Sequence, residues 1–173
     1  MTAGDTWAGS DFQQPPRTDG GVALCGACRR TGICRLGLTT ERLDEQGEAH
    51  FEIVCPAEHE GGPGVAHGGW TAGVLDEVLG HVPILHGLIS VTGTLTVRFV
   101  RPVPIERQLH ARAWVARRDE RKWTVEGELR LAGSDALLAK AEGIFVLRDP
   151  ATHFGNFQRW LAEQAATPEE QST

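Results

Sequence analysis

The residues best suited to chemistry are a histidine, two glycines beside it and one carboxylate. His67, Gly68 and Gly69 follow a segment rich in glycine and proline, and Asp76 comes nine residues after His67. A helix that starts at these glycines offers unpaired backbone N–H groups and the positive end of its dipole, both of which suit a developing negative charge. Asp76 is the carboxylate that such a helix would present nearby.

The helix that positions these residues is framed by helix breakers. Pro63 and its neighbouring glycines prevent regular structure before it, and Pro83 cannot continue a helix after it, so we predict a helix from about His67 to about Val82. One side of this helix is apolar. The other side is nearly bare, with members at spacings of three and four: Gly69, Ala72, Gly73, Asp76 and Gly80.

The bare face has two interpretations. Glycine inside a helix costs about 1 kcal/mol relative to alanine, so several glycines on one face indicate that a ligand or a neighbouring backbone approaches closely. In the alternative interpretation the glycines only allow tight packing of the helix on a sheet, and Asp76 is a solvated carboxylate.

The motif resembles a known family. The pattern G-x-x-H-G-G that begins at Gly64, with Asp76 at its fixed distance, is similar to the signature of the hotdog-fold acyl-CoA thioesterases, in particular the phenylacetate-pathway and 4-hydroxybenzoyl-CoA thioesterase branch. The stretch from Val91 and Thr92 to Pro102 and Val103 resembles the strand that follows in this family. The likeness covers roughly residues 31 to 148.

This resemblance implies a function. It implies an α+β hotdog fold, with a long central helix wrapped by an antiparallel sheet of five or six strands, in a homodimer or a dimer-of-dimers homotetramer with active sites between subunits. It also implies hydrolysis of an acyl-CoA thioester to free acid and CoA, without a cofactor. The acyl group is not defined by the sequence.

The resemblance also implies roles for single residues. The backbone N–H of Gly68 would donate to the thioester oxyanion, and Asp76 would act as general base or as nucleophile. Thr92 matches a hydroxyl that holds the attacking water, and His67 matches a histidine that orients the loop. The expected substrate contacts are Gly69, Gly61 and Trp70, of which Trp70 is equally well explained as a core residue.

The chain departs from the family at one position. Many relatives carry an asparagine that helps to bind the thioester six residues before the motif histidine, where this chain has Gly61. This departure favours the alternative of a hotdog protein that binds acyl-CoA without hydrolysing it. A hotdog hydratase or dehydratase is a third interpretation, although the spacing from His67 to Asp76 does not match the usual hydratase pattern.

Alternating apolar and polar residues predict the strands around the helix. The segments 36–42 and 49–55 form a hairpin, and short connections make the four later strands antiparallel: Thr94–Phe99, Leu109–Val115, Trp123–Leu131 and Leu137–Leu147. We predict a mobile tail over residues 1–21, a hotdog domain over 22–150, and an amphipathic helix and tail over 151–173. In the last of these, Thr152 caps a helix with Phe154, Phe157, Trp160 and Leu161 on one side.

The four cysteines allow two interpretations. Cys25 and Cys28 form a C-x-x-C pair, with Cys34 and Cys55 further along. Such a pair places two thiolates within reach of one zinc ion, but the pattern is only half of a structural zinc site. The alternative is four reduced thiols, and we predict no metal in the catalytic site.

The charge and hydropathy of the chain limit the kinds of partner that we expect. The net charge is −6, which argues against nucleic acid in general, although the segment 98–122 has eight basic and three acidic residues and could attract the phosphates of a nucleotide-bearing substrate. No apolar run approaches the length of a membrane span, and the first residues do not resemble a secretory signal, so we expect no membrane partner and a cytoplasmic location.

Overall fold

One six-stranded antiparallel sheet forms the body of the protein. The computed structural model describes residues 15–165. The strands lie in the order β1-β2-β6-β7-β8-β5, with β1 Leu38–Leu43, β2 Ala49–Val54, β6 Gln108–Arg118, β7 Lys122–Leu131, β8 Ala136–Leu147 and β5 Ser90–Phe99. Every neighbouring pair is antiparallel, and β1 and β2 form the predicted hairpin. The six predicted strands are confirmed.

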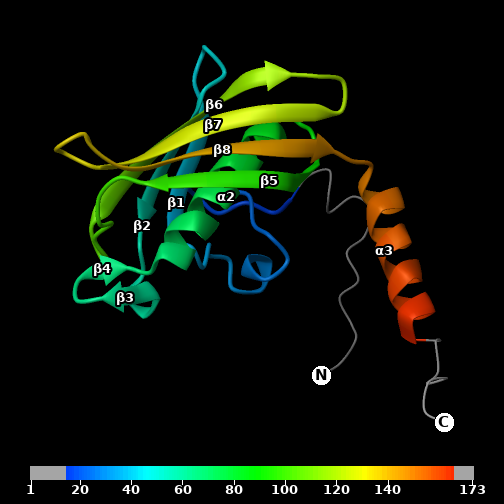
Figure 1. Cartoon of the computed structure of the whole chain (residues 1–173), viewed down its shortest axis with the longest axis horizontal. Coiled ribbons are helices and arrows are strands. Elements are labelled where there is room, and N and C mark those ends of the chain that lie inside the picture. The colour runs from blue at the N-terminus through cyan, green and yellow to red at the C-terminus, as the bar shows by residue number, and fades with distance from the viewer. Residues whose placement is uncertain (1–14, 166–173) are drawn as a thin grey trace, which may run out of the picture.

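The helix α2, Gly68–Leu85, lies across one face of this sheet (Figure 1). Its apolar residues, such as Val74, Leu75, Val78 and Leu79, have no exposed surface. Alternate residues of β2, β6 and β7 are buried, as expected for strands with one face on the helix and the other toward solvent. A long helix wrapped by an antiparallel sheet is the hotdog fold, as predicted.

The close approach of helix and sheet depends on a glycine in the sheet. A Cβ built at Gly127 would lie 2.8 Å from Leu79 Cδ1. By contrast, a Cβ at Gly73 on the helix would meet no atom within 4 Å. The bare face of α2 around Gly73 is therefore open in this protomer, and packing against its own sheet does not explain it.

The predicted end of the helix at Val82 is wrong by one turn. Pro83 lies inside α2, which continues to Leu85. Proline removes one backbone N–H donor, but its fixed φ is compatible with helix, and His86 N–H still donates to Val82 O. Pro83 therefore removes the one helical hydrogen bond that its own N–H would donate, and α2 continues two residues beyond it.

The glycine-rich segment before the helix is also more regular than expected. Strands β3, Glu60–Gly62, and β4, Val65–Ala66, form a small hairpin after two short 3-10 turns, η1 Cys28–Arg30 and η2 Ala57–His59. Gly64 takes the positive φ of +73° that its turn needs. Ala66 N–H donates to Val103 O, which ties the hairpin to the segment after β5.

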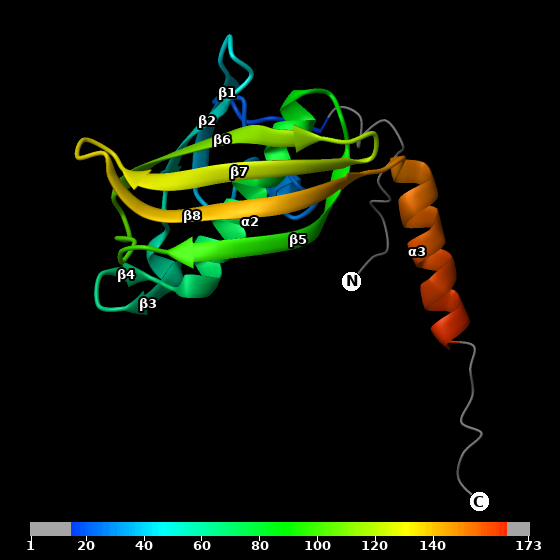
Figure 2. The same cartoon turned by 45° about the horizontal axis from the view of Figure 1, so that its top comes forward.

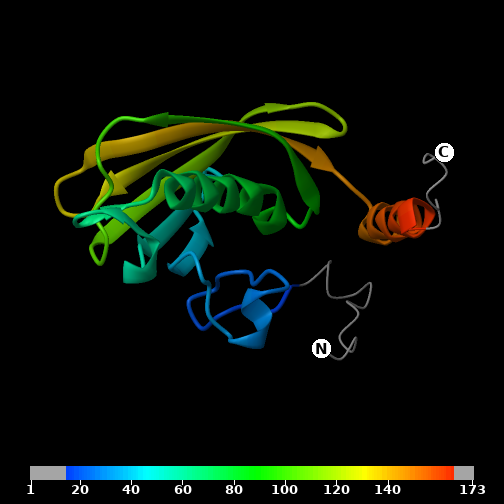
Figure 3. The ribbon, with the colours of Figure 1, turned by 60° about the horizontal axis from the view of Figure 1, so that its bottom comes forward.

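The N-terminal segment packs on the side of α2 that faces away from the sheet (Figure 3). Within it, Arg17 forms a β-bridge with Ala23, and Val22 is fully buried. The predicted mobile tail falls partly on residues 1–14, which lie outside the described residues together with Trp7 and Phe12. Residues 15–21 lie in the described part of the chain.

The helix α3, Pro150–Ala165, leaves the end of β8 and projects from the body (Figures 1 and 2). It begins two residues before the predicted cap at Thr152, because Asp149 Oδ1 accepts from Thr152 N–H and caps the helix instead. None of its residues is buried. The predicted tail from residue 166 lies outside the described residues. Among the helices within residues 15–165, none is long and apolar enough to cross a membrane.

Candidate active site

Asp76 and Thr92 meet where α2 crosses the start of β5. Thr92 Oγ1 donates to Asp76 Oδ1 over 2.9 Å. The register of β5 against β8 shifts between Thr92 and Thr94, which is the irregularity of a β-bulge at Gly93, and bulges commonly redirect a neighbouring side chain. The structure thus places the hydroxyl of Thr92, which was predicted to hold the attacking water, in direct contact with Asp76.

The pKa of Asp76 is higher in the protein than that of a free aspartate in water. Partial burial raises the pKa of Asp76 above its ordinary value of 3.8, the hydrogen bond from Thr92 opposes this rise, and the charge of Glu77 adds to it. A carboxylate with a raised pKa that lies in a cavity is a candidate for proton transfer. Asp76 is therefore the residue of this region that is best suited to act as a base.

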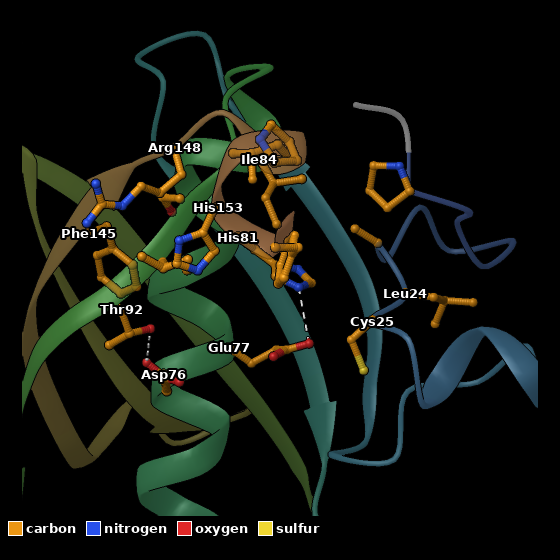
Figure 4. Close-up of a pocket in the computed structure, with 18 residues that line it drawn as sticks. Leu24, Cys25, Asp76, Glu77, His81, Ile84, Thr92, Phe145, Arg148 and His153 are labelled. Atoms are coloured by element: carbon orange, nitrogen blue, oxygen red, sulfur yellow. Dashed lines mark hydrogen bonds and ion pairs between the residues drawn. The ribbon is translucent and has the colours of Figure 1, made fainter. Parts of the chain in front are cut away.

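A cavity of about 250 Å³ opens beside this carboxylate (Figure 4). Asp76 and Thr92 lie at one end of the cavity, while His153 of α3 points into it from above. Most of the lining is apolar and comes from four parts of the chain: the N-terminal segment, α2, the β5 and β8 ends, and the start of α3. Such a cavity accepts an apolar group next to a reactive carboxylate.

The His67 loop forms a second half-site at the start of α2. His67 is the N-cap, and its Nδ1 accepts from Gly69 N–H over 2.9 Å. Gly68 is the first helical residue, and its N–H has no acceptor within residues 15–165. This N–H is a free donor at the positive end of the helix dipole, which is the arrangement predicted for an oxyanion.

Gly61 lies against this loop. A Cβ built at Gly61 would lie 2.6 Å from His67 Cα, which is too close for any side chain. The β3–β4 hairpin therefore requires glycine here. An asparagine at this position, as in many family members, would force the His67 loop to move.

The two half-sites are far apart in one protomer. Gly68 and Asp76 are eight residues apart on one helix, which corresponds to about 12 Å along its axis. One thioester carbonyl cannot contact both groups at that separation. The structure brings Asp76 together with Thr92, and Gly68 together with His67, Gly69 and Gly61, but it does not join the two groups within one chain.

Trp70 lies in the hydrophobic core and not in the cavity beside Asp76. Its side chain belongs to the hydrophobic core and has only 4% of its surface exposed. It does not line the cavity beside Asp76, and its nearest aromatic neighbour is His59. A role of Trp70 in binding substrate remains a prediction.

Sequence analysis missed a buried charged cluster next to the cavity. His81 Nδ1 contacts Glu41 Oε2 at 2.5 Å and His81 Nε2 contacts Glu77 Oε1 at 3.2 Å, while Arg17 forms an ion pair with Glu41. Burial lowers the pKa of His81, but the hydrogen bonds that its ring N–H groups donate to Glu41 and Glu77, together with the charges of these two carboxylates, outweigh burial and raise that pKa to about 9. Glu77 and His81 are four residues apart, so the helical spacing was visible in the sequence, whereas the contact with Glu41 was not.

All four cysteines are free thiols, and one of them lines the cavity. Cys25 is exposed and lines the cavity, while Cys28, Cys34 and Cys55 are buried and none of the four forms a disulfide. Burial raises the pKa of Cys28 and of Cys55 to about 11, so both are neutral thiols at pH 7. Within residues 15–165, the one group of side chains with suitably close metal-ligand atoms is Asp44 and Glu48 of the β1–β2 turn with His50 of β2, and it contains no cysteine.

Comparison with known proteins supports the relationship that the motif indicated. Residues 63–137 match the thioesterase superfamily. The matched segment contains the His67 loop, Asp76 and Thr92, and ends at the start of β8.

Solved structures with this fold include several thioesterase relatives. The chain is 30% identical to RHA08564, described as a thioesterase superfamily protein, with a TM-score of 0.57 over 61% of this chain and 54% of that one. It therefore spans about half of that protein's length. The E. coli PaaI protein from the phenylacetic acid degradation operon is 22% identical, with a TM-score of 0.59 over 69% and 87% of the two chains.

A third relative was crystallised with a ligand. The protein smu.793 from Streptococcus mutans, whose crystal structure contains acetyl CoA, is 16% identical, with a TM-score of 0.57 over 65% of this chain and 87% of that one. At this identity the likeness defines the fold alone.

Proposed function

We propose that this protein hydrolyses an acyl-CoA thioester to a free acid and CoA. The observation that carries the proposal is Asp76, a half-buried carboxylate with a raised pKa that accepts a hydrogen bond from Thr92 at the end of an apolar cavity. The match to the thioesterase superfamily supports it, as does the acetyl CoA held by the S. mutans relative.

The reaction requires a second protomer. Strand β5 is an edge strand, none of its ten residues is buried, and it has only β8 as a neighbour. A long open edge of this kind invites pairing with another strand. Antiparallel pairing of two copies of β5 over their full length places Ser90 of one protomer opposite Phe99 of the other.

This pairing completes the site. Gly68 lies beside Phe99, since a Cβ built at Gly68 would be 3.9 Å from the Phe99 ring. Phe99 is at the end of β5, and Thr92 with its bonded Asp76 is near the start. An antiparallel dimer therefore brings Gly68 of one protomer toward Asp76 of its partner, so that the two half-sites form one site.

In this site each group has a defined role. Asp76 removes a proton from water, and the water oxygen attacks the thioester carbonyl carbon. The carbonyl oxygen becomes an oxyanion that accepts from the Gly68 N–H. The C–S bond then breaks, and Asp76 returns the proton to the CoA sulfur. In the nucleophilic alternative, Asp76 attacks the carbonyl carbon itself, the C–S bond breaks and CoA leaves as the thiolate. Water then hydrolyses the resulting anhydride, which releases the acid and regenerates Asp76.

Two other functions of the family have weaker support. The absence of an asparagine at Gly61 favours a protein that only binds acyl-CoA, but the contact of Gly61 with His67 gives that glycine a structural reason. A hydratase needs a histidine that can accept a proton. His81, the histidine of α2 nearest Asp76, has both ring nitrogens engaged by Glu41 and Glu77.

The test is release of free thiol from short, medium, long and aromatic acyl-CoAs, measured with a disulfide-exchange dye. Wild-type protein should turn over at least one of these, and Asp76→Asn should lose that activity. Asp119→Asn, an exposed carboxylate in the β6–β7 turn, is the matched control and should retain it. Binding of acyl-CoA without thiol release by the wild type would refute hydrolysis.

A further inference from the structure

The large apolar side chains of α3 lie on one face and are exposed. Phe157, Trp160 and Leu161 have 51%, 52% and 46% of their surfaces exposed, and Phe154 has 38%. At 100° per residue these four side chains fall within one 120° sector of the helix, which we call the α3 stripe. Four large apolar groups on one face exceed the scattered exposure that is usual on a protein surface.

The path of α3 shows where this stripe lies relative to the sheet. His153 and Phe154 line the cavity beside Asp76, so the stripe starts at the cavity. From there α3 runs past the open edge of β5, away from β8 (Figures 1 and 2). The rest of the stripe therefore lies beyond the last strand of its own sheet, in the region that a second sheet would occupy.

A complementary apolar patch lies at the other end of β5. Phe99 and Val100 have 57% and 41% of their surfaces exposed. They border a shallow groove with Val65, Gly68 and Pro102. This patch cannot reach the α3 stripe of its own chain, because β5 is ten residues long and separates them by about 30 Å.

We propose that the α3 stripe docks on the Phe99–Val100 patch of a second copy of this chain. The inference rests on the proposed function, because it uses the antiparallel β5 pairing of that dimer. In this pairing, Phe99 of the partner lies opposite Ser90, at the end of β5 next to which α3 emerges. The α3 stripe of one protomer thus meets the Phe99–Val100 patch of the other, and the twofold symmetry of the dimer forms this contact twice.

The contact also has a consequence for the site. The partner's Gly68 lies beside its Phe99, so an α3 helix docked there crosses the composite site. His153 and Phe154 then form a wall that is held in place by the partner. We infer that α3 closes the acyl-binding cavity and that substitutions in the outer part of the stripe raise KM.

Cross-linking tests this contact in the full chain. Trp160→Cys and Val100→Cys are placed in separate, differently tagged chains that also carry Cys25→Ser, which removes the exposed native thiol. Treatment of the co-expressed pair with a short bis-maleimide should give a covalent dimer. Each variant treated alone should not, because like positions lie at opposite ends of the dimer.

A charge test complements the cross-link. Phe157→Asp with Trp160→Asp should raise the dimer dissociation constant by about tenfold or more, since large apolar anchors dominate interfaces. Asn156→Asp with Ala162→Asp adds the same charges outside the stripe and should leave that constant unchanged. All four residues are exposed, so the protomer should fold in either variant.

The outcomes separate this inference from the proposed function. Sedimentation reports whether the chain is dimeric, and thiol release reports whether it is a thioesterase. A dimer that releases thiol but gives no cross-link in the co-expressed pair would overturn the docking of α3 alone. A chain that stays monomeric at high concentration would overturn both the docking and the shared site.

Discussion

Two carboxylates, Glu41 beside α2 and Asp76 on it, have pKa values that the fold shifts in opposite directions. Glu41 is buried, yet its pKa is lowered: burial raises it, and the hydrogen bond and charge of His81, the Ala23 N–H and Arg17 together outweigh that effect. Asp76 is less buried, yet its pKa is raised, because a single hydroxyl from Thr92 does not compensate for burial and for the neighbouring Glu77.

The opposite pKa shifts indicate that Glu41 serves stability and Asp76 serves reactivity. Glu41 is held by groups of opposite charge and joins the N-terminal segment to α2, so it stabilises the fold, and it does not line the cavity. The negative charge of Asp76 has too few stabilising partners to offset its burial, and Asp76 faces a cavity. This costs stability but leaves a basic oxygen for a reaction. Burial alone therefore does not identify the functional carboxylate, whereas the number of its partners does.

Removal of the undercompensated carboxylate should have the largest effect. Asp76→Asn keeps the size of the side chain and removes its basic oxygen, so kcat should fall by about 10³-fold. The free energy of unfolding should stay the same or increase, because the partly buried charge is gone. Steady-state thiol release and urea unfolding measure the two quantities. A variant that retains wild-type kcat would exclude Asp76 from the chemistry.

Removal of the compensated carboxylate should act on stability instead. Glu41→Ala removes the ion-pair partner of Arg17 and leaves His81 with Glu77 alone, and loss of one member of a buried ion pair costs about 3–5 kcal/mol of unfolding free energy. The folded fraction should keep a kcat within about twofold of wild type, since Glu41 does not face the substrate. If kcat fell as far as in Asp76→Asn while stability was unchanged, the distinction between the two carboxylates would be wrong.

The hydroxyl of Thr92 should have an intermediate effect on the reaction. Thr92→Val keeps the shape and removes the donor, so kcat should fall by about tenfold. Because this hydrogen bond lowers the pKa of Asp76, its loss should move the acid limb of the kcat/KM profile to higher pH. Thr94→Val, two residues along the same strand, is the control. A pH profile identical to wild type would show that Thr92 does not act through Asp76.

The pH dependence should distinguish the two regions in the wild type. The active form of Asp76 is unprotonated, so kcat/KM should fall as pH decreases through a value above 3.8. His81 has a folded pKa of about 9 against 6.5 for the free side chain, so its stabilisation is complete below pH 6.5 and is lost as pH rises through about 9. Thermal unfolding between pH 6 and pH 10 should show a Tm that falls over the upper range, and a flat profile would contradict the charged state of His81.

Local patterns in the sequence were enough for most of the fold and for half of the site. Alternation predicted all six strands, and spacing placed Asp76 on the bare face of α2, because both depend on neighbouring residues along the chain. The family motif singled out both Asp76 and Thr92, but their direct hydrogen bond was found only in the structure. Pro83 misled the prediction of the helix end, since a proline near the last turn removes only one of the helix's donors.

The rest depends on contacts that no local pattern contains. Glu41 and His81 are 40 residues apart and belong to an exposed-looking strand and an apolar helix, so their pairing was not predictable from either segment. The separation of Gly68 and Asp76 follows from helix geometry, and the resemblance already implied active sites between subunits, but the strand proposed to pair two protomers was identified only from the exposed edge of β5. The role of Gly61 depended on its distance from His67.

The most direct test of the shared site is complementation between two inactive variants. Gly68→Pro removes the oxyanion N–H but suits the first position of a helix, and His67 already has the extended conformation that precedes proline. A dimer of one Gly68→Pro chain and one Asp76→Asn chain contains one intact site, formed by Gly68 of the second chain and Asp76 of the first. Co-expression of the two should therefore restore about a quarter of wild-type thiol release, since random pairing makes half of the dimers mixed. Activity no higher than that of either variant alone would contradict a site shared between protomers.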